Sequence, residues 1–183
     1  MMQQTFLLRP ASASDAPALK RLIERSARAL SVGFYTHEQT EAVTREVFGV
    51  DSQLLADRTY YAIESEQTIV ACGGWGRRST LCGGDQAKPA LERLLDRASE
   101  PARIRAFFVD PAMARRGLGS MLMTRCAEQA ALAGFGQLEL VATTPGVPLY
   151  RALGFVEVER YDLVLNAGVR VPVARMRRAA QPA

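Results

Sequence analysis

Residues 103–133 constrain the fold of this chain more than any other part of the sequence. Arg103 to Val109 is a run of β-forming residues that Asp110-Pro111 closes. Apolar residues then recur at helical spacing from Gly117 to about Ala133. A strand that leads through a turn into an amphipathic helix is typical of layered α/β domains. We therefore predict an α/β domain in which this helix packs its apolar face against a sheet.

The rest of the chain contributes further strands and helices. Expected strands lie at Phe6–Leu8, Thr59–Glu64, Thr68–Trp75, Leu138–Ala142, Phe155–Leu165 and Val169–Met176. Helices are expected to begin near Ser14 and at Thr36, with a shorter one over Val147–Leu153. Gln39, three residues after Thr36, completes a capping-box pattern. The 183 residues show no internal repeat and no linker, so we predict one α/β domain with a mixed sheet over residues 1–183.

A long connection interrupts these elements at about residues 76–102. Gly83-Gly84-Asp85 marks a turn within it. Leu91, Leu94 and Leu95 suggest a short helix in its second half. Connections of this length are often functional or mobile.

Composition excludes several classes of function. The formal net charge is only +4, and no basic stripe carries interleaved aromatic residues, so nucleic acid is not an expected partner. Three cysteines without CxxC spacing and a single histidine argue against a metal site and against disulfides. Neither a membrane-length apolar run nor a signal-like N-terminal segment is present. We expect a reduced, cytoplasmic protein without a membrane partner.

The start of the helix after Asp110 has the features of an anion-binding turn. Backbone N–H groups at a helix start attract anions, and Gly117 and Gly119 remove Cβ atoms that would hold a phosphate away. Arg115 and Arg116 add positive charge at the same place. An arginine-rich loop before a glycine-started helix explains these residues equally well. Neither the GxxxxGK[ST] pattern nor the dinucleotide fingerprint fits the segment.

Two runs of sequence resemble the motifs of one enzyme family. Val109 to Ser120 resembles motif A of the GCN5-related N-acetyltransferase (GNAT) family, with its [Q/R]xxGx[G/A] pattern, and Pro148 to Phe155 resembles the family's motif B. The order of elements matches over nearly the whole chain. Ala114 stands where the family normally has Gln or Arg. The resemblance implies a mostly antiparallel mixed sheet flanked by helices, and an acyltransferase that uses acetyl-CoA and no metal.

The resemblance also implies roles for individual residues. Tyr150 would protonate the departing coenzyme A thiolate; a packed aromatic residue is the structural alternative. The implied cofactor-binding residues are Phe107, Phe108 and Val109 beside the pantetheine arm, and Arg115, Arg116, Gly117, Leu118, Gly119 and Ser120 around the pyrophosphate. The implied reaction is acetyl transfer to a primary amine of a small molecule or peptide. A non-catalytic sensor or scaffold that binds coenzyme A thioesters is the alternative, and a homodimer stays open.

The acceptor site is less defined by the sequence. Tyr35 and Glu38 fall where relatives wall the acceptor, and either one, or a water chain, could serve as the general base. In a regular strand Arg103, Arg105 and Phe107 share one face, so Arg105 could meet an acceptor carboxylate; a solvated strand arginine is the alternative. Trp75 could wall the pocket or belong to the core.

Overall fold

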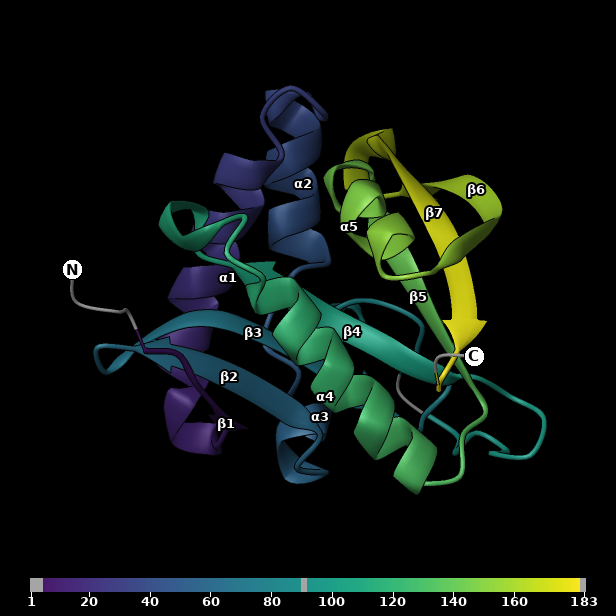
Figure 1. The fold of residues 1–183 in the computed structure, drawn as a ribbon. Coiled ribbons are helices and arrows are strands. Elements are labelled where there is room, and N and C mark those ends of the chain that lie inside the picture. The colour runs from purple at the N-terminus through teal and green to yellow at the C-terminus, as the bar shows by residue number, and fades with distance from the viewer. Residues whose placement is uncertain (1–4, 90–91, 182–183) are drawn as a thin grey trace.

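A seven-stranded sheet in the order β1-β2-β3-β4-β5-β7-β6 forms the centre of the molecule (Figure 1). The computed structural model describes residues 5–89 and 92–181. The strands are β1 (Leu7–Pro10), β2 (Tyr60–Ser65), β3 (Thr68–Gly76), β4 (Ala102–Val109), β5 (Gln137–Thr143), β6 (Val156–Val164) and β7 (Arg170–Ala179). The helices are α1 (Ala16–Leu30), α2 (His37–Glu46), α3 (Ser52–Ala56), α4 (Leu118–Leu132) and α5 (Val147–Ala152). All neighbouring strands are antiparallel except β4 and β5, which confirms the predicted mixed, mostly antiparallel sheet flanked by helices.

The two parallel strands separate soon after they meet. Their pairing is limited to Ala102 with Leu138 and Arg103 with Glu139. Beyond these pairs β4 stays on β3, whereas β5 stays on β7. The sheet therefore opens between β4 and β5, and the later residues of β4 lack a strand partner on that side.

Helices cover both faces of the sheet. Leu118, Leu122 and Cys126 bury the apolar side of α4 against one face. Leu19, Leu22 and Ile23 do the same for α1 on the opposite face. In Figure 1, α4 crosses in front of the sheet, while α1 lies behind it and α2 packs beside α1. No helix of the described residues is long and apolar enough to cross a membrane.

A β-bulge at Ala106 reverses the alternation of side chains in β4. Ala106 has φ of 58°, and the register with β3 shifts between Cys72 and Gly74. Phe107 consequently packs on the α4 side, while Phe108 packs on the α1 side. The prediction that Phe107 shares a face with Arg105 is therefore wrong. A Cβ at Gly73 would lie 2.6 Å from the Phe107 ring, so this glycine makes room for the redirected side chain.

The structure confirms the predicted start of one further helix and corrects the predictions for two others. Thr36 caps α2 with both bonds of the predicted capping box. The first helix begins after Asp15 instead of Ser14, because Ser12 caps a preceding 3-10 turn. The prediction of a short helix around Leu91 to Leu95 is wrong for residues 92–95, which are not helical. Leu91 itself lies outside the described residues. Leu94 instead forms a β-bridge with Arg78, which ties the connection to the end of β3.

Candidate active site

A cleft of about 680 Å³ occupies the opening between β4 and β5. Its lining includes the last six residues of β4, the first turn of α4, most of α5, the C-terminal parts of α1 and α2, the segment 81–84 and a few residues of β5, β6 and β7. Because α4 and α2 lie on opposite faces of the sheet, the cleft passes through the sheet from one face to the other. One binding site could therefore bring together ligands that enter from two sides.

One end of the cleft is formed by the start of α4. Gly117 is the N-cap of this helix with φ of +81°, and no side chain caps the helix there. A Cβ at Gly117 would meet nothing within 4 Å, so the space beside these backbone N–H groups is open. Arg115, also left-handed at φ of 65°, lines the cleft, whereas Arg116 lies outside its lining. The turn can hold an anion through backbone donors, the helix dipole and Arg115.

Gly119 also has a packing role that the sequence did not indicate. A Cβ at this position would lie 3.0 Å from Cδ2 of Leu149 in α5. Gly119 is buried, and its missing side chain lets α5 approach the first turn of α4. This glycine therefore shapes the cleft through helix packing, although its backbone still lines the cleft beside Leu118 and Ser120.

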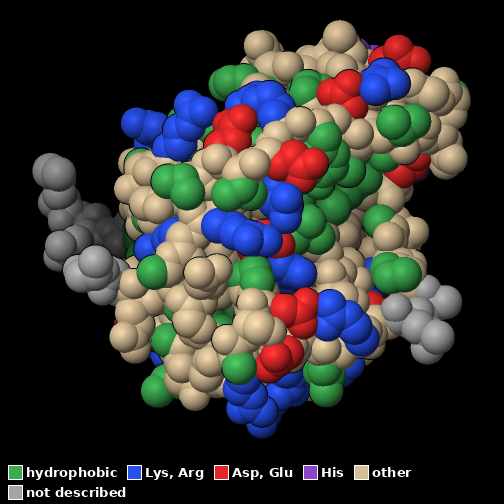
Figure 2. Space-filling view, turned by 90° about the vertical axis from the view of Figure 1, so that its right-hand side faces the viewer, with side chains coloured by type: hydrophobic (Ala, Val, Ile, Leu, Met, Phe, Trp, Pro, Cys, Tyr) green, Lys and Arg blue, Asp and Glu red, His purple; other side chains and the backbone are tan. Residues whose placement is uncertain are grey.

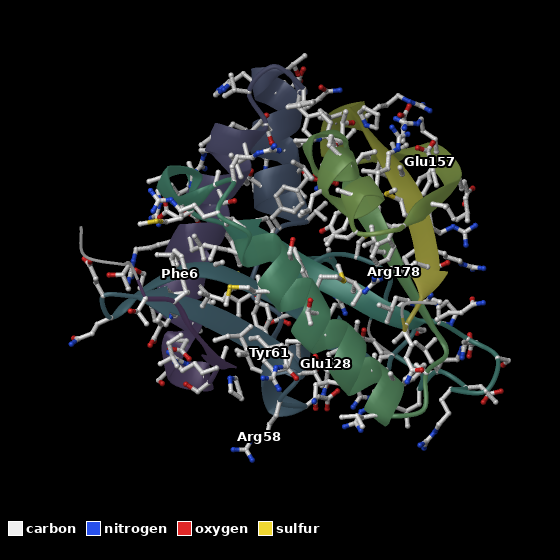
Figure 3. All side chains as sticks on the ribbon, viewed as in Figure 1. Phe6, Arg58, Tyr61, Glu128, Glu157 and Arg178 are labelled. Atoms are coloured by element: carbon white, nitrogen blue, oxygen red, sulfur yellow. The ribbon has the colours of Figure 1, made fainter. Side chains whose placement is uncertain are left out.

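Tyr150 in α5 lines the cleft between two aromatic rings. Its ring centroid lies 6.3 Å from that of Phe107 and 5.8 Å from that of Phe155, both edge-on. Arg178 of β7, which is labelled in Figure 3, covers the Phe155 ring at 5.2 Å and donates to the Leu153 carbonyl. These contacts fix the stack against β7. Burial, followed by the Cys126 thiol, raises the pKa of the Tyr150 phenol well above its ordinary value of 10.0. The phenol is therefore a neutral proton donor at neutral pH.

The residues of β4 after Arg103 line the cleft along its length. Phe107, Phe108 and Val109 all contribute to the lining. The Val109 N–H donates to Oγ of Ser26 on α1 at 3.3 Å. With β5 displaced, this stretch of backbone has no strand partner on the side of the cleft, as a ligand that mimics a strand would require.

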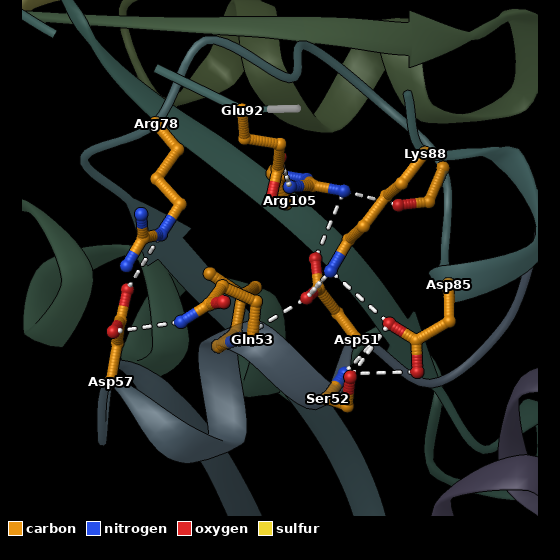
Figure 4. Close-up of polar contacts among 11 residues, drawn as sticks. Asp51, Ser52, Gln53, Asp57, Arg78, Asp85, Lys88, Glu92 and Arg105 are labelled. Carbon is orange, nitrogen blue, oxygen red and sulfur yellow. Dashed lines mark hydrogen bonds and ion pairs between the residues drawn. The ribbon is translucent and has the colours of Figure 1, made fainter. Parts of the chain in front are cut away.

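Arg105 lines the cleft but is already paired. Its Nη2 lies 2.9 Å from Oδ2 of Asp51, and its Nη1 lies 3.7 Å from Oε1 of Glu92 (Figure 4). The same guanidinium donates to the Gly83 carbonyl, and Lys88 forms a second ion pair with Asp51. Arg105 thus anchors the long connection against the sheet. Its charge is compensated by a buried carboxylate.

The other three residues expected at the acceptor side lie outside the cleft lining. Tyr35 donates its hydroxyl to the Pro172 carbonyl at 2.7 Å and accepts from the Thr144 N–H at 2.9 Å. It therefore fastens the α1–α2 connection to β7. Glu38 is exposed on the first turn of α2. Trp75 is buried against Phe135, with ring centroids 6.1 Å apart.

Sequence reasoning missed part of the cleft wall. Leu81, Cys82, Gly83 and Gly84 of the long connection line it, as does Phe34 after α1. The Gly84 N–H donates to the Val47 carbonyl at 2.7 Å, which holds this segment beside α2. In the sequence, Gly83 and Gly84 predicted a turn but did not indicate that this segment lines a cleft. Among the described residues, no group of three or more His, Cys, Asp or Glu is placed to hold a metal ion.

Comparison with known proteins gives a family and a fold. The sequence profile of the Acetyltransferase (GNAT) family matches residues 20–155. No curated protein matches the chain significantly in sequence.

Several solved structures share the whole fold. A GCN5-related N-acetyltransferase from Rhodopseudomonas palustris is 19% identical, with a TM-score of 0.71 and 98% of both chains covered. The PaiA N-acetyltransferase of Thermoplasma acidophilum, solved in complex with coenzyme A, is 13% identical, with a TM-score of 0.65 and 96% of this chain and 99% of that chain covered. A GNAT family acetyltransferase of Brucella melitensis, in complex with acetyl-CoA, is 15% identical, with a TM-score of 0.57 and coverages of 98% and 91%. At these identities the likenesses establish the fold.

Proposed function

The chain belongs to the acetyltransferase (GNAT) family, and we propose that it transfers the acetyl group of acetyl-CoA to a primary amine of a small molecule or peptide. The observation that carries this proposal is the cleft between β4 and β5, which has an uncapped helix start at one end and a protonated phenol within it. Two relatives of the same fold were solved with coenzyme A or acetyl-CoA. The charge and shape of this cleft suit the same ligand.

We assign the diphosphate of the cofactor to the turn from Arg115 to Ser120. Backbone N–H groups and the dipole of a 15-residue helix favour a dianion there, and Arg115 and Arg116 supply compensating charge. The pantetheine arm then lies along Phe107 to Val109 and bonds to backbone groups of the open strand edge other than the Val109 N–H, which already donates to Oγ of Ser26. Neither assignment requires a metal ion.

Tyr150 supplies a proton when the thioester is cleaved. The amine nitrogen attacks the thioester carbonyl carbon, a C–N bond forms, and the C–S bond breaks with its electron pair on sulfur. The Tyr150 phenol, which is protonated at neutral pH, donates its proton to that sulfur as negative charge develops there. The nitrogen releases its surplus proton to water, and water returns a proton to the phenolate. Holding amine and thioester together in one cleft contributes the rest of the acceleration.

The test is thiol release from acetyl-CoA in the presence of a panel of primary amines, with mass spectrometry of the products. The proposal predicts one N-acetylated amine for each free thiol. Binding of coenzyme A without turnover on any amine would favour a sensor or scaffold. Failure to bind either coenzyme A or acetyl-CoA would overturn the proposed ligand.

A further inference from the structure

The part of the cleft that lies away from α4 is walled by apolar side chains. They come from the end of α1 and the connection after it, from the two residues that follow α2, and from the last two strands. The residues concerned are Leu30, Phe34, Val47, Phe48, Leu163 and Val173. Seen from the β6 and β7 side, hydrophobic side chains gather in a hollow flanked by charged ones (Figure 2). A substrate that binds here is transferred from water to an apolar surface.

The charges in the lining are all positive. Among the described residues that line the cleft, only Arg105 and Arg115 are charged, and none is Asp, Glu or His. Arg105 is compensated by Asp51, and Arg115 stands at the start of α4. A positive group on the acceptor would therefore meet an apolar wall, with no carboxylate to receive it. Burial of such an unpaired ammonium is strongly unfavourable.

The same surroundings act on the amine that reacts. An apolar wall without a carboxylate lowers the pKa of a bound ammonium, so the neutral amine is the form that binds. A neutral amine already carries the lone pair that attacks the thioester, and no side-chain base is needed to create it. After attack the nitrogen gives its surplus proton to water, while the sulfur receives the proton of Tyr150. Water then returns a proton to the Tyr150 phenolate, so atoms and charges balance.

We infer that the acceptor is a primary monoamine attached to an apolar group, and that it enters the cleft uncharged. This inference rests on the proposed acetyl transfer. It excludes polyamines, aminoglycosides and lysine side chains next to further positive charge, since each would bring a second ammonium into the cleft. Arylalkyl or alkyl monoamines, and peptides with an apolar first residue, carry an apolar group that matches the apolar wall.

The experiment compares hexylamine with 1,6-diaminohexane, which differ essentially in the second ammonium. Acetyl transfer is measured with the intact protein at a fixed pH and acetyl-CoA concentration. We expect kcat/KM for hexylamine to exceed that for the diamine by on the order of tenfold or more, since a tenfold ratio requires only about 1.4 kcal/mol and an unpaired buried charge costs more.

A variant pair tests whether the wall causes the preference. Phe34 lines the cleft and is 51% exposed, so Phe34→Glu places a carboxylate there without disturbing the core. Val32, two residues earlier, is 77% exposed and lies outside the lining, so Val32→Glu is the matched control. Phe34→Glu should raise kcat/KM for the diamine relative to hexylamine by several-fold, whereas Val32→Glu should leave the ratio unchanged.

The outcomes separate the two proposals. A diamine accepted as well as hexylamine by the unmodified protein, or a ratio unmoved by Phe34→Glu, would overturn the inference about the acceptor and leave acetyl transfer standing. Transfer to neither amine, with transfer to polycationic amines instead, would do the same. Absence of coenzyme A binding would overturn the proposed function itself.

Discussion

The Arg105 guanidinium and the Asp51 carboxylate form an ion pair of 2.9 Å, from Nη2 to Oδ2, in the wall of the cleft. Their side chains are only 3% and 0% exposed. Asp51 also caps α3 by accepting from the Leu54 N–H at 3.1 Å, and Lys88 brings the long connection to the same carboxylate. One buried carboxylate therefore joins β4, α3 and the segment that closes one side of the cleft.

Asp51→Ala should strongly destabilise the protein. The substitution leaves the Arg105 and Lys88 charges without their buried partner, and loss of one member of such a pair costs about 3–5 kcal/mol. Asp162→Ala is the control, because Asp162 pairs with Arg170 at the surface and its loss should cost at most about 1 kcal/mol. Urea unfolding of both variants measures the difference. Equal free energies of unfolding would show that the buried network does not hold the connection.

Arg115→Glu should weaken coenzyme A binding. The substitution replaces a charge-assisted donor with a carboxylate beside the expected diphosphate, and one such bond contributes about 1.5–3 kcal/mol. Arg125→Glu makes the same change in charge on the exposed side of α4 and outside the cleft lining. Calorimetric titration should show a loss of at least about tenfold for Arg115→Glu alone. An equal effect of both variants would indicate only a long-range charge effect.

Tyr150→Phe should lower kcat while it preserves cofactor affinity. The variant keeps the ring between Phe107 and Phe155 and removes only the proton donor. Positioned proton transfer contributes about 10²–10⁴-fold, and the loss should appear in kcat because charge develops on sulfur only during the reaction. Steady-state rates and coenzyme A titration of the folded variant measure the two effects. Near-normal turnover would mean that water protonates the thiolate.

The pH profile of kcat should lack a falling limb below pH 10. Burial raises the pKa of Tyr150 above 10.0, so the acid keeps its proton throughout that range and loses it only at higher pH. Tyr150 lowers the free energy of unfolding only as pH rises above 10, because its phenol ionises in the unfolded state at a lower pH than in the folded state. Rates measured from pH 6 to 10 should therefore rise or stay level. A falling limb between pH 7 and 9 that disappears in Tyr150→Phe would contradict this assignment.

The sequence predicted the elements that local patterns control. The strand before Asp110, the helix that begins after Gly117 and the capping box at Thr36 all depend on residues that are neighbours in the chain. The bulge at Ala106 gave no such signal, because an alanine with positive φ carries no mark in the sequence. The space that the redirected Phe107 ring fills is provided by Gly73 of the neighbouring strand, which is far away in the sequence.

The roles of the residues predicted at the acceptor side are decided by contacts between residues that are far apart in the sequence. Arg105 and Asp51 are more than fifty positions apart, and nothing local to Arg105 indicates that its charge is already compensated. Tyr35 likewise has both hydrogen-bond partners far along the chain, at Thr144 and Pro172. A sequence shows which groups could contact a substrate. The tertiary contacts decide which of them are already occupied.

Hydrogen–deuterium exchange with and without saturating coenzyme A tests most directly whether the opening between β4 and β5 is the cofactor site. Residues 106–109 and 115–120 are the backbone segments that would contact pantetheine and diphosphate. The account predicts slower exchange in both segments on binding, with little change in β1 and β2 at the far side of the sheet. Saturated binding without protection of either segment would contradict it.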